Sequence, residues 1–78
     1  MNRADYIDMI VVGLQKNNID YNILLKHIID ENFINIENFF VIYCPLVYKY
    51  FVENKITNYE KLEILKDSII EYAASEYK

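Results

Sequence analysis

Glycine and proline are almost absent from this chain, and their scarcity limits the folds open to it. Gly13 and Pro45 are the only such residues among 78. A sheet of several strands in so short a chain needs tight turns, which glycine and proline normally supply. Apolar residues instead recur at helical spacing, so we expect one all-α domain over residues 1–78. The spacing predicts a compact bundle of about four helices, at residues 3–16, 21–31, 36–54 and 58–75.

Polar residues mark where the expected helices start and stop. Asn17-Asn18 closes the first helix, because Asn tolerates the left-handed conformation that commonly follows one. Asp20 and Asn35 can cap the second and third helices by accepting hydrogen bonds from unpaired backbone N–H groups. Thr57 and Glu60 fit a capping box, in which each side chain bonds the backbone of the other residue. Every helix after the first therefore has its own start signal.

The expected third helix is the most apolar part of the chain. From Phe39 to Val52, twelve of fourteen residues are apolar or tyrosine. A helix that is apolar around most of its circumference is central in the fold or covered by a second molecule. Pro45 removes a backbone hydrogen bond in its middle, so we expect a kink or a break there. A strand at residues 39–43 is the alternative, since short apolar runs are ambiguous by periodicity.

Several apolar residues fall outside the main buried faces. The main stripe of the expected third helix is Phe39, Tyr43, Leu46 and Tyr50. A second stripe, nearly opposite, consists of Val41, Tyr48 and Val52. On the fourth helix, Ile64 falls on the polar side with Ser68. Because Tyr and apolar side chains carry many protein interfaces, we expect Val41, Tyr48, Val52 and Ile64 to bind a protein partner, or a second copy in a homodimer formed through the third helix.

The charge distribution argues against a nucleic-acid partner. The net charge is −4 at pH 7 and the pI is near 4.8. Residues 1–18 and 36–56 are each neutral, whereas residues 19–35 and 57–78 each carry −2. Nucleic-acid binding needs clustered Lys and Arg, and no segment here is net basic.

The sequence also gives no sign of a membrane segment. The apolar run at residues 39–52 is shorter than the about 20 residues of a membrane span, and it contains Lys49. Residues 1–5 lack the basic start and apolar continuation of a signal peptide. We therefore expect an intracellular protein, in the cytoplasm of its source or of a host cell, without a membrane partner.

The residues that usually carry catalysis are few. His27 is the only histidine and lies one helical turn from Glu31, which is a common surface pairing. Cys44 is the only cysteine, so an intrachain disulfide and a multi-cysteine zinc site are excluded. In an apolar helix it is expected to be a small buried hydrophobe. We expect no catalytic, metal-binding or cofactor-binding residue, no cofactor and no small-molecule substrate.

An apolar excess without catalytic chemistry favours a non-enzymatic protein-binding protein, either accessory or inhibitory. Ile, Asn, Lys and Tyr make up 37 of the 78 residues, and AT-rich codons encode all four. This bias indicates a phage, a virus or a mobile element with an AT-rich genome as the source.

Two alternative functions remain open. The second helix, the turn at residues 32–35 and the start of the third helix could form the helix-turn-helix of a transcriptional regulator, although residues 36–44 offer bases only Glu37 and Asn38. Tyr43-Cys44-Pro45, preceded by Leu24-Leu25-Lys26-His27 on a second helix, resembles the immunity proteins of nuclease colicins. Those are acidic four-helix proteins with Tyr-Tyr-Pro on a short third helix, so the resemblance implies a toxin-immunity protein. The second Tyr of that motif and the Asp before it are absent here.

Overall fold

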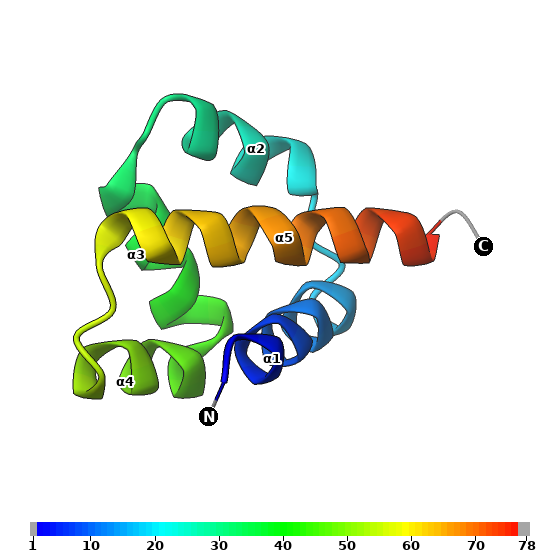
Figure 1. Cartoon of the computed structure of the whole chain (residues 1–78). Helices are drawn as coiled ribbons and strands as arrows, with labels where there is room; N and C mark the ends of the chain where they lie inside the picture. The colour runs from blue at the N-terminus through cyan, green and yellow to red at the C-terminus, as the bar shows by residue number, and fades with distance from the viewer. Residues whose placement is uncertain (1, 77–78) are drawn as a thin grey trace.

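The structure, a computed structural model, describes residues 2–76, which form helices and connecting turns with no strand (Figure 1). Five helices follow one another along these residues: α1 (Arg3–Lys16), α2 (Tyr21–Ile29), α3 (Phe33–Tyr43), α4 (Pro45–Glu53) and α5 (Asn58–Glu76). The all-α prediction is confirmed for this part of the chain. The alternative of a strand at residues 39–43 is wrong, because this segment lies within α3.

The predicted third helix is two helices, which is why the described chain has five and not four. Cys44 separates α3 from α4 with φ of −136° and ψ of 56°, and Pro45 occupies the first turn of α4. Proline lacks the N–H that would continue α3, and it disfavours the α conformation at the residue before it. Neither property is costly at the first position of a new helix. The chain therefore breaks at Pro45.

Two of the predicted caps are present. The Asp20 carboxylate accepts a hydrogen bond of 3.0 Å from the N–H of Asn22 at the start of α2. The Thr57 hydroxyl accepts a hydrogen bond of 3.2 Å from the N–H of Glu60 at the start of α5. Both side chains thus satisfy donors that a helix leaves unpaired in its first turn. Among residues 2–76 the return bond from the Thr57 N–H to the Glu60 side chain is not formed, so only half of the predicted capping box is present.

The predicted cap at Asn35 is wrong, because α3 begins earlier. Asn32 caps this helix, and its side chain accepts a hydrogen bond of 3.2 Å from the N–H of Asn35. Glu31 adopts a left-handed conformation with φ of 50° directly after α2. Because α2 also ends before the predicted residue 31, the turn lies at residues 30–32 and is one residue shorter than predicted.

The helices pack around one apolar core. Figure 1 shows α5 crossing the middle of the molecule, with α2 on one side of it and α1 and α4 on the other. The Phe51 ring of α4 lies between two other rings, 5.0 Å from Tyr6 of α1 and 5.1 Å from Phe40 of α3. These aromatic contacts tie α1, α3 and α4 together. The other buried apolar residues are Ile10, Leu14, Leu24, Ile36, Phe39, Cys44, Val47, Leu62, Ile64, Leu65, Ile69 and Tyr72.

α5 buries a wider face than its sequence predicts. Ile64 and Ser68, expected on its polar side, are 1% and 0% exposed. The Ser68 hydroxyl is satisfied inside the helix by donating a hydrogen bond of 2.7 Å to the carbonyl of Ile64. Both α1 and α2 contact α5, so two of its sides are covered. Tyr59 lies at the exposed start of α5 and packs edge-on against Phe33.

Candidate functional site

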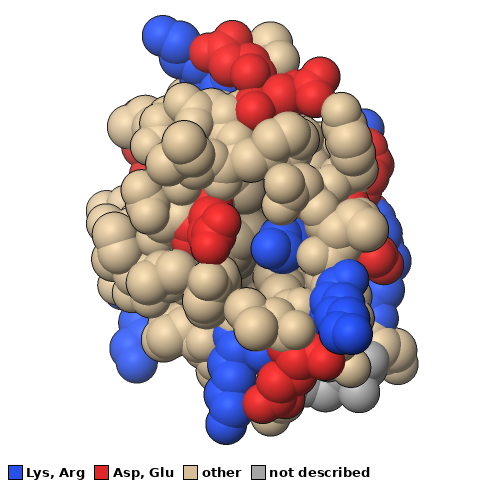
Figure 2. Space-filling model, turned by 90° about the vertical axis from the view of Figure 1, so that its left-hand side faces the viewer, with Lys and Arg blue, Asp and Glu red and all other residues tan. Residues whose placement is uncertain are grey.

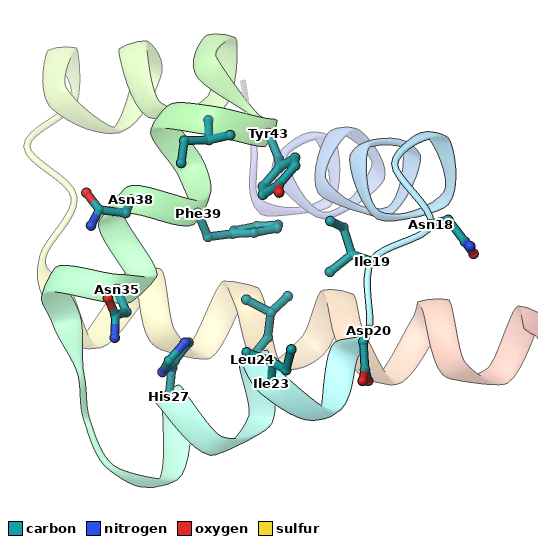
Figure 3. A pocket seen from close by; sticks show the side chains of 11 residues that line it. Asn18, Ile19, Asp20, Ile23, Leu24, His27, Asn35, Asn38, Phe39 and Tyr43 are labelled. Atoms are coloured by element: carbon teal, nitrogen blue, oxygen red, sulfur yellow. The ribbon is translucent and has the colours of Figure 1, made fainter.

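A first surface groove lies between α2 and α3, with a volume of about 340 Å³ (Figure 3). The buried side chains of Phe39 and Leu24 point into it from opposite sides. His27 stands at one end with two asparagines of α3. Asn18 and Asp20 lie at the opposite end, so the groove is apolar at its base and has polar residues at both ends. Its full lining is Asn18, Ile19, Asp20, Ile23, Leu24, His27, Asn35, Asn38, Phe39, Ile42 and Tyr43.

A second groove lies between α1 and the α3–α4 junction, with a volume of about 520 Å³. It is lined by Met9, Val12, Gly13, Lys16, Asn17, Ile42, Tyr43, Cys44, Pro45, Leu46 and Val47. Ile42 and Tyr43 line both grooves, so they form a ridge between them. The two grooves are consequently parts of one surface.

Large apolar side chains are exposed along this surface. We call the five of them the ridge surface: Val12, Ile23, Ile42, Tyr43 and Leu46. Ile42 is 66% exposed, although it stands at the centre of the set. Single exposed apolar residues are ordinary on proteins, whereas a contiguous set around grooves is typical of an interaction site. The ridge surface is therefore the strongest candidate for a functional site.

The break at Pro45 explains why part of the ridge surface is exposed. On one continuous helix, Tyr43 and Leu46 would share a stripe with Phe39, which is buried. Because Cys44 leaves the helical conformation, α4 starts in a new direction and its register no longer follows that of α3. Leu46, which follows the break, is therefore left facing solvent. Tyr43 keeps the register of α3 and packs on Phe39, and it is partly exposed at the end of that helix.

The structure separates the four residues predicted to bind a partner. Val41 and Val52 are exposed, and Tyr48 is half-buried. Ile64 lies in the core, so its place in a binding surface is wrong. It faces Tyr6 and Ile56 near the start of α1, because α1 covers the side of α5 that the sequence pattern assigns to solvent.

One hydrogen bond brings the remaining three predicted residues to the same side of the molecule. The Tyr48 hydroxyl of α4 donates a hydrogen bond of 2.9 Å to the Glu37 carboxylate of α3. Val41 follows Glu37 by one helical turn, and Val52 follows Tyr48 by one turn. Val41 and Val52 thus lie near this hydrogen bond, whereas the ridge surface joins residues of α3 and α4 to residues of α1 and α2.

Sequence reasoning missed the ridge surface, although two signals were present. Helical spacing predicts buried faces of Ala4, Ile7, Ile10, Val11 and Leu14 on the first helix and of Tyr21, Leu24, Leu25 and Ile28 on the second. Val12 and Ile23 are apolar residues outside these two faces. The sequence assigns Leu46 to the stripe of Phe39 and Tyr43 only if one helix register continues past Pro45. A separate register on each side of the proline would have removed that assignment.

The titratable groups near the grooves are not arranged as a catalytic pair. His27 and Asp20 line the same groove but are seven residues apart, about 10 Å along a helix axis. Burial raises the pKa of the Cys44 thiol to about 11, so it is protonated at neutral pH. Among residues 2–76, no cluster of three or more His, Cys, Asp or Glu side chains could hold a metal ion.

Charged residues occupy the edges of the α3–α4 side of the molecule more than its middle. Figure 2 shows that uncharged residues cover most of this side, with isolated charged side chains among them. Arg3 of α1 pairs with Asp67 of α5. Within the described helices, none combines the length and apolar character needed to cross a membrane.

The chain has no match among protein-family models, curated proteins or solved structures.

Proposed function

We propose that this chain is a non-enzymatic accessory or inhibitory protein that works by binding protein through the ridge surface. The observation that carries the proposal is the position of Ile42 and Tyr43, which are exposed and line both grooves. Apolar side chains that project beside grooves can enter a partner while the partner's side chains fill the grooves. Such reciprocal packing is the usual centre of a protein interface.

The proposed helix-turn-helix alternative receives less support from the geometry. α3 would be the recognition helix, and it offers base edges only Asn35, Asn38 and Glu37 and has no Lys or Arg to contact phosphates. Its Glu37 carboxylate already accepts the Tyr48 hydrogen bond and would repel phosphates. A toxin-immunity protein would be one case of protein binding through the ridge surface, with the toxin as the partner.

Site-specific photo-crosslinking tests the proposal. A benzophenone amino acid at Ile42 in the full chain, expressed in its source cells, should give a light-dependent adduct to a protein that mass spectrometry identifies. The matched control places the same amino acid at Glu71, an exposed position on α5, and should give no such adduct. Absence of any adduct from Ile42, Val12 and Leu46 would overturn the proposal.

A further inference from the structure

Charges and an apolar residue are ordered along the outer face of α1. Asp8, Val12 and Lys16 follow one another at intervals of four residues, so they share one face of the helix. All three are exposed, and Val12 is 58% exposed. Neither Asp8 nor Lys16 forms an ion pair with another residue in the 2–76 range. The face thus presents an acidic group, an apolar group and a basic group that are open to an external partner.

This order is complementary to itself. Asp8 and Lys16 each lie four residues from Val12, about 6 Å along the axis in opposite directions. A second copy of α1, turned by a two-fold axis through Val12, would place its Lys16 against Asp8 and its Asp8 against Lys16. Two-fold interfaces pair one surface with itself in this way. A parallel arrangement would bring like charges together.

We infer that the partner of the ridge surface is a second copy of this chain, in a two-fold dimer centred on Val12. This inference rests on the proposed function and names its partner. Because the two Val12 side chains meet at the axis, the Asp8–Lys16 pairs lie on either side of them. Attraction between these charges sets the antiparallel direction, and burial of Val12 and Met9 supplies affinity.

The surface area that a stable dimer must bury extends the interface from α1 into the second groove. A standard interface buries roughly 800 Å² per partner. This is about a sixth of the 5046 Å² surface of the chain, more than one face of α1 offers. Val12 and Met9 also form one wall of the second groove, and Ile42 and Leu46 belong to its other side. The dimer therefore includes these side chains of the α3–α4 junction.

The charge distribution permits this contact. Residues 1–18, which include α1, carry two positive and two negative side chains. Residues 36–56, which include the α3–α4 junction, also carry two of each sign. The net charge of −4 comes from the segments 19–35 and 57–78. Two copies can thus associate through their neutral segments and keep their net negative segments away from the centre of the contact.

Two matched valine substitutions test the position of the interface. Val12 and Val52 are 58% and 56% exposed, and each lies on a helix surface. Sedimentation of the full chain between roughly 1 μM and 1 mM should show a monomer–dimer equilibrium. Val12→Asp should weaken dimerisation roughly a hundredfold, whereas Val52→Asp should leave it within about threefold. A monomer throughout this range, or dissociation by Val52→Asp and not by Val12→Asp, would overturn the inference.

Charge reversal tests the antiparallel pairing. Asp8→Lys or Lys16→Asp alone replaces two attractive pairs in the dimer by two repulsive ones and should raise the dissociation constant roughly ten- to thirtyfold. The double variant restores both pairs and should return to within about threefold of the original value. Lys66→Asp, on α5, changes the net charge as Lys16→Asp does and should have no such effect. A double variant no better than either single variant would contradict the pairing.

Two further readouts keep these outcomes interpretable. Circular dichroism of each variant should show an unchanged helical spectrum, because all substituted side chains are exposed. Crosslinking from Ile42 then separates the two proposals. A monomeric chain that crosslinks to a different protein would overturn the dimer and leave the proposed function standing, whereas a monomer that crosslinks to nothing would overturn both.

Discussion

Gly13 of α1 and Cys44 at the α3–α4 junction are in such close contact that no side chain fits between them. A β-carbon added to Gly13 would lie 2.9 Å from the Cys44 sulfur and 3.4 Å from the carbonyl oxygen of Tyr43. Gly13 is helical, and its φ is not positive. The glycine is therefore required by the approach of α1 to the junction and not by its backbone conformation. This approach also sets the second groove, since both residues line it.

Substitution of Gly13 should reveal this contact. Alanine improves helix propensity by about 1 kcal/mol, but a methyl group forced against a packed core typically costs about 1–3 kcal/mol. We expect Gly13→Ala to lower the free energy of unfolding by about 1 kcal/mol in urea denaturation at fixed protein concentration. In the Cys44→Ala background, where the sulfur is absent, the same change should be neutral or stabilising. Equal destabilisation in both backgrounds would show that the sulfur does not limit the approach.

The raised pKa of Cys44 predicts a loss of stability at high pH. Burial raises it from 9.0 to about 11, so the folded chain holds its proton over a range in which the unfolded chain releases it. The free energy of unfolding should therefore fall between pH 9 and pH 11, by at most about 3 kcal/mol. The difference in stability between the parent and Cys44→Ala, measured at pH 8 and pH 11, isolates this term. A difference independent of pH would refute it.

The same burial predicts an unreactive thiol. A pKa two units above 9.0 lowers the thiolate fraction at pH 8 roughly a hundredfold, and the thiolate is the form that alkylating reagents attack. Iodoacetamide should modify Cys44 at least that much more slowly in the native chain than in urea. Similar alkylation rates in the native chain and in urea would mean that the α3–α4 junction opens readily. Gly13→Ala should loosen this junction and therefore speed alkylation of Cys44 in the native chain.

The sequence determined the elements of this fold better than their packing. Helical spacing, the cap at Asp20 and the cap at Thr57 are local properties, so they could be predicted. The break at Pro45 was one of two outcomes allowed by a missing N–H, and the register of the residues after it depends on which occurs. For that reason a continuous helix register predicts Leu46 in a buried stripe, whereas it is exposed.

The errors on α5 have a different origin. Periodicity shows which side of a helix is most apolar, but not how many neighbours the fold places around that helix. Because α1 and α2 both pack on α5, Ile64 and Ser68 are buried on a side that looks polar in sequence. The ridge surface was missed for the same reason, since it joins residues of α1, α2, α3 and α4 that only the tertiary fold brings together.

The Tyr48–Glu37 hydrogen bond predicts that Tyr48 ionises at a higher pH than an ordinary tyrosine. The bond from its hydroxyl and the negative charge of Glu37, with a smaller contribution from desolvation, raise the Tyr48 pKa above the usual 10.0. Glu37→Gln removes the charge, so it should lower the pKa of Tyr48 toward that value. Carbon-13 NMR of the tyrosine ring carbon bonded to the hydroxyl measures this directly. An unchanged Tyr48 titration in Glu37→Gln would show that the bond is not formed in solution.

Ser68 offers a test of the buried side of α5. Its hydroxyl donates to the Ile64 carbonyl, which also accepts a hydrogen bond from the helix backbone. Ser68→Ala therefore leaves no buried group unsatisfied. We expect this change to alter stability by less than about 0.5 kcal/mol. Ser68→Asp instead places a carboxylate in the core without a partner and should cost about 3 kcal/mol or more, a large part of the roughly 4–12 kcal/mol expected for a chain of this length.

Ser75 provides the matched control, because it lies on the same helix and is exposed. Its hydroxyl donates to the Tyr72 carbonyl, much as Ser68 donates to Ile64. Ser75→Asp should therefore change the midpoint of thermal unfolding by no more than a few degrees, as for surface substitutions generally. If Ser68→Asp were tolerated as well as Ser75→Asp, then Ile64 and Ser68 would face solvent, and α1 could not pack on α5 as described.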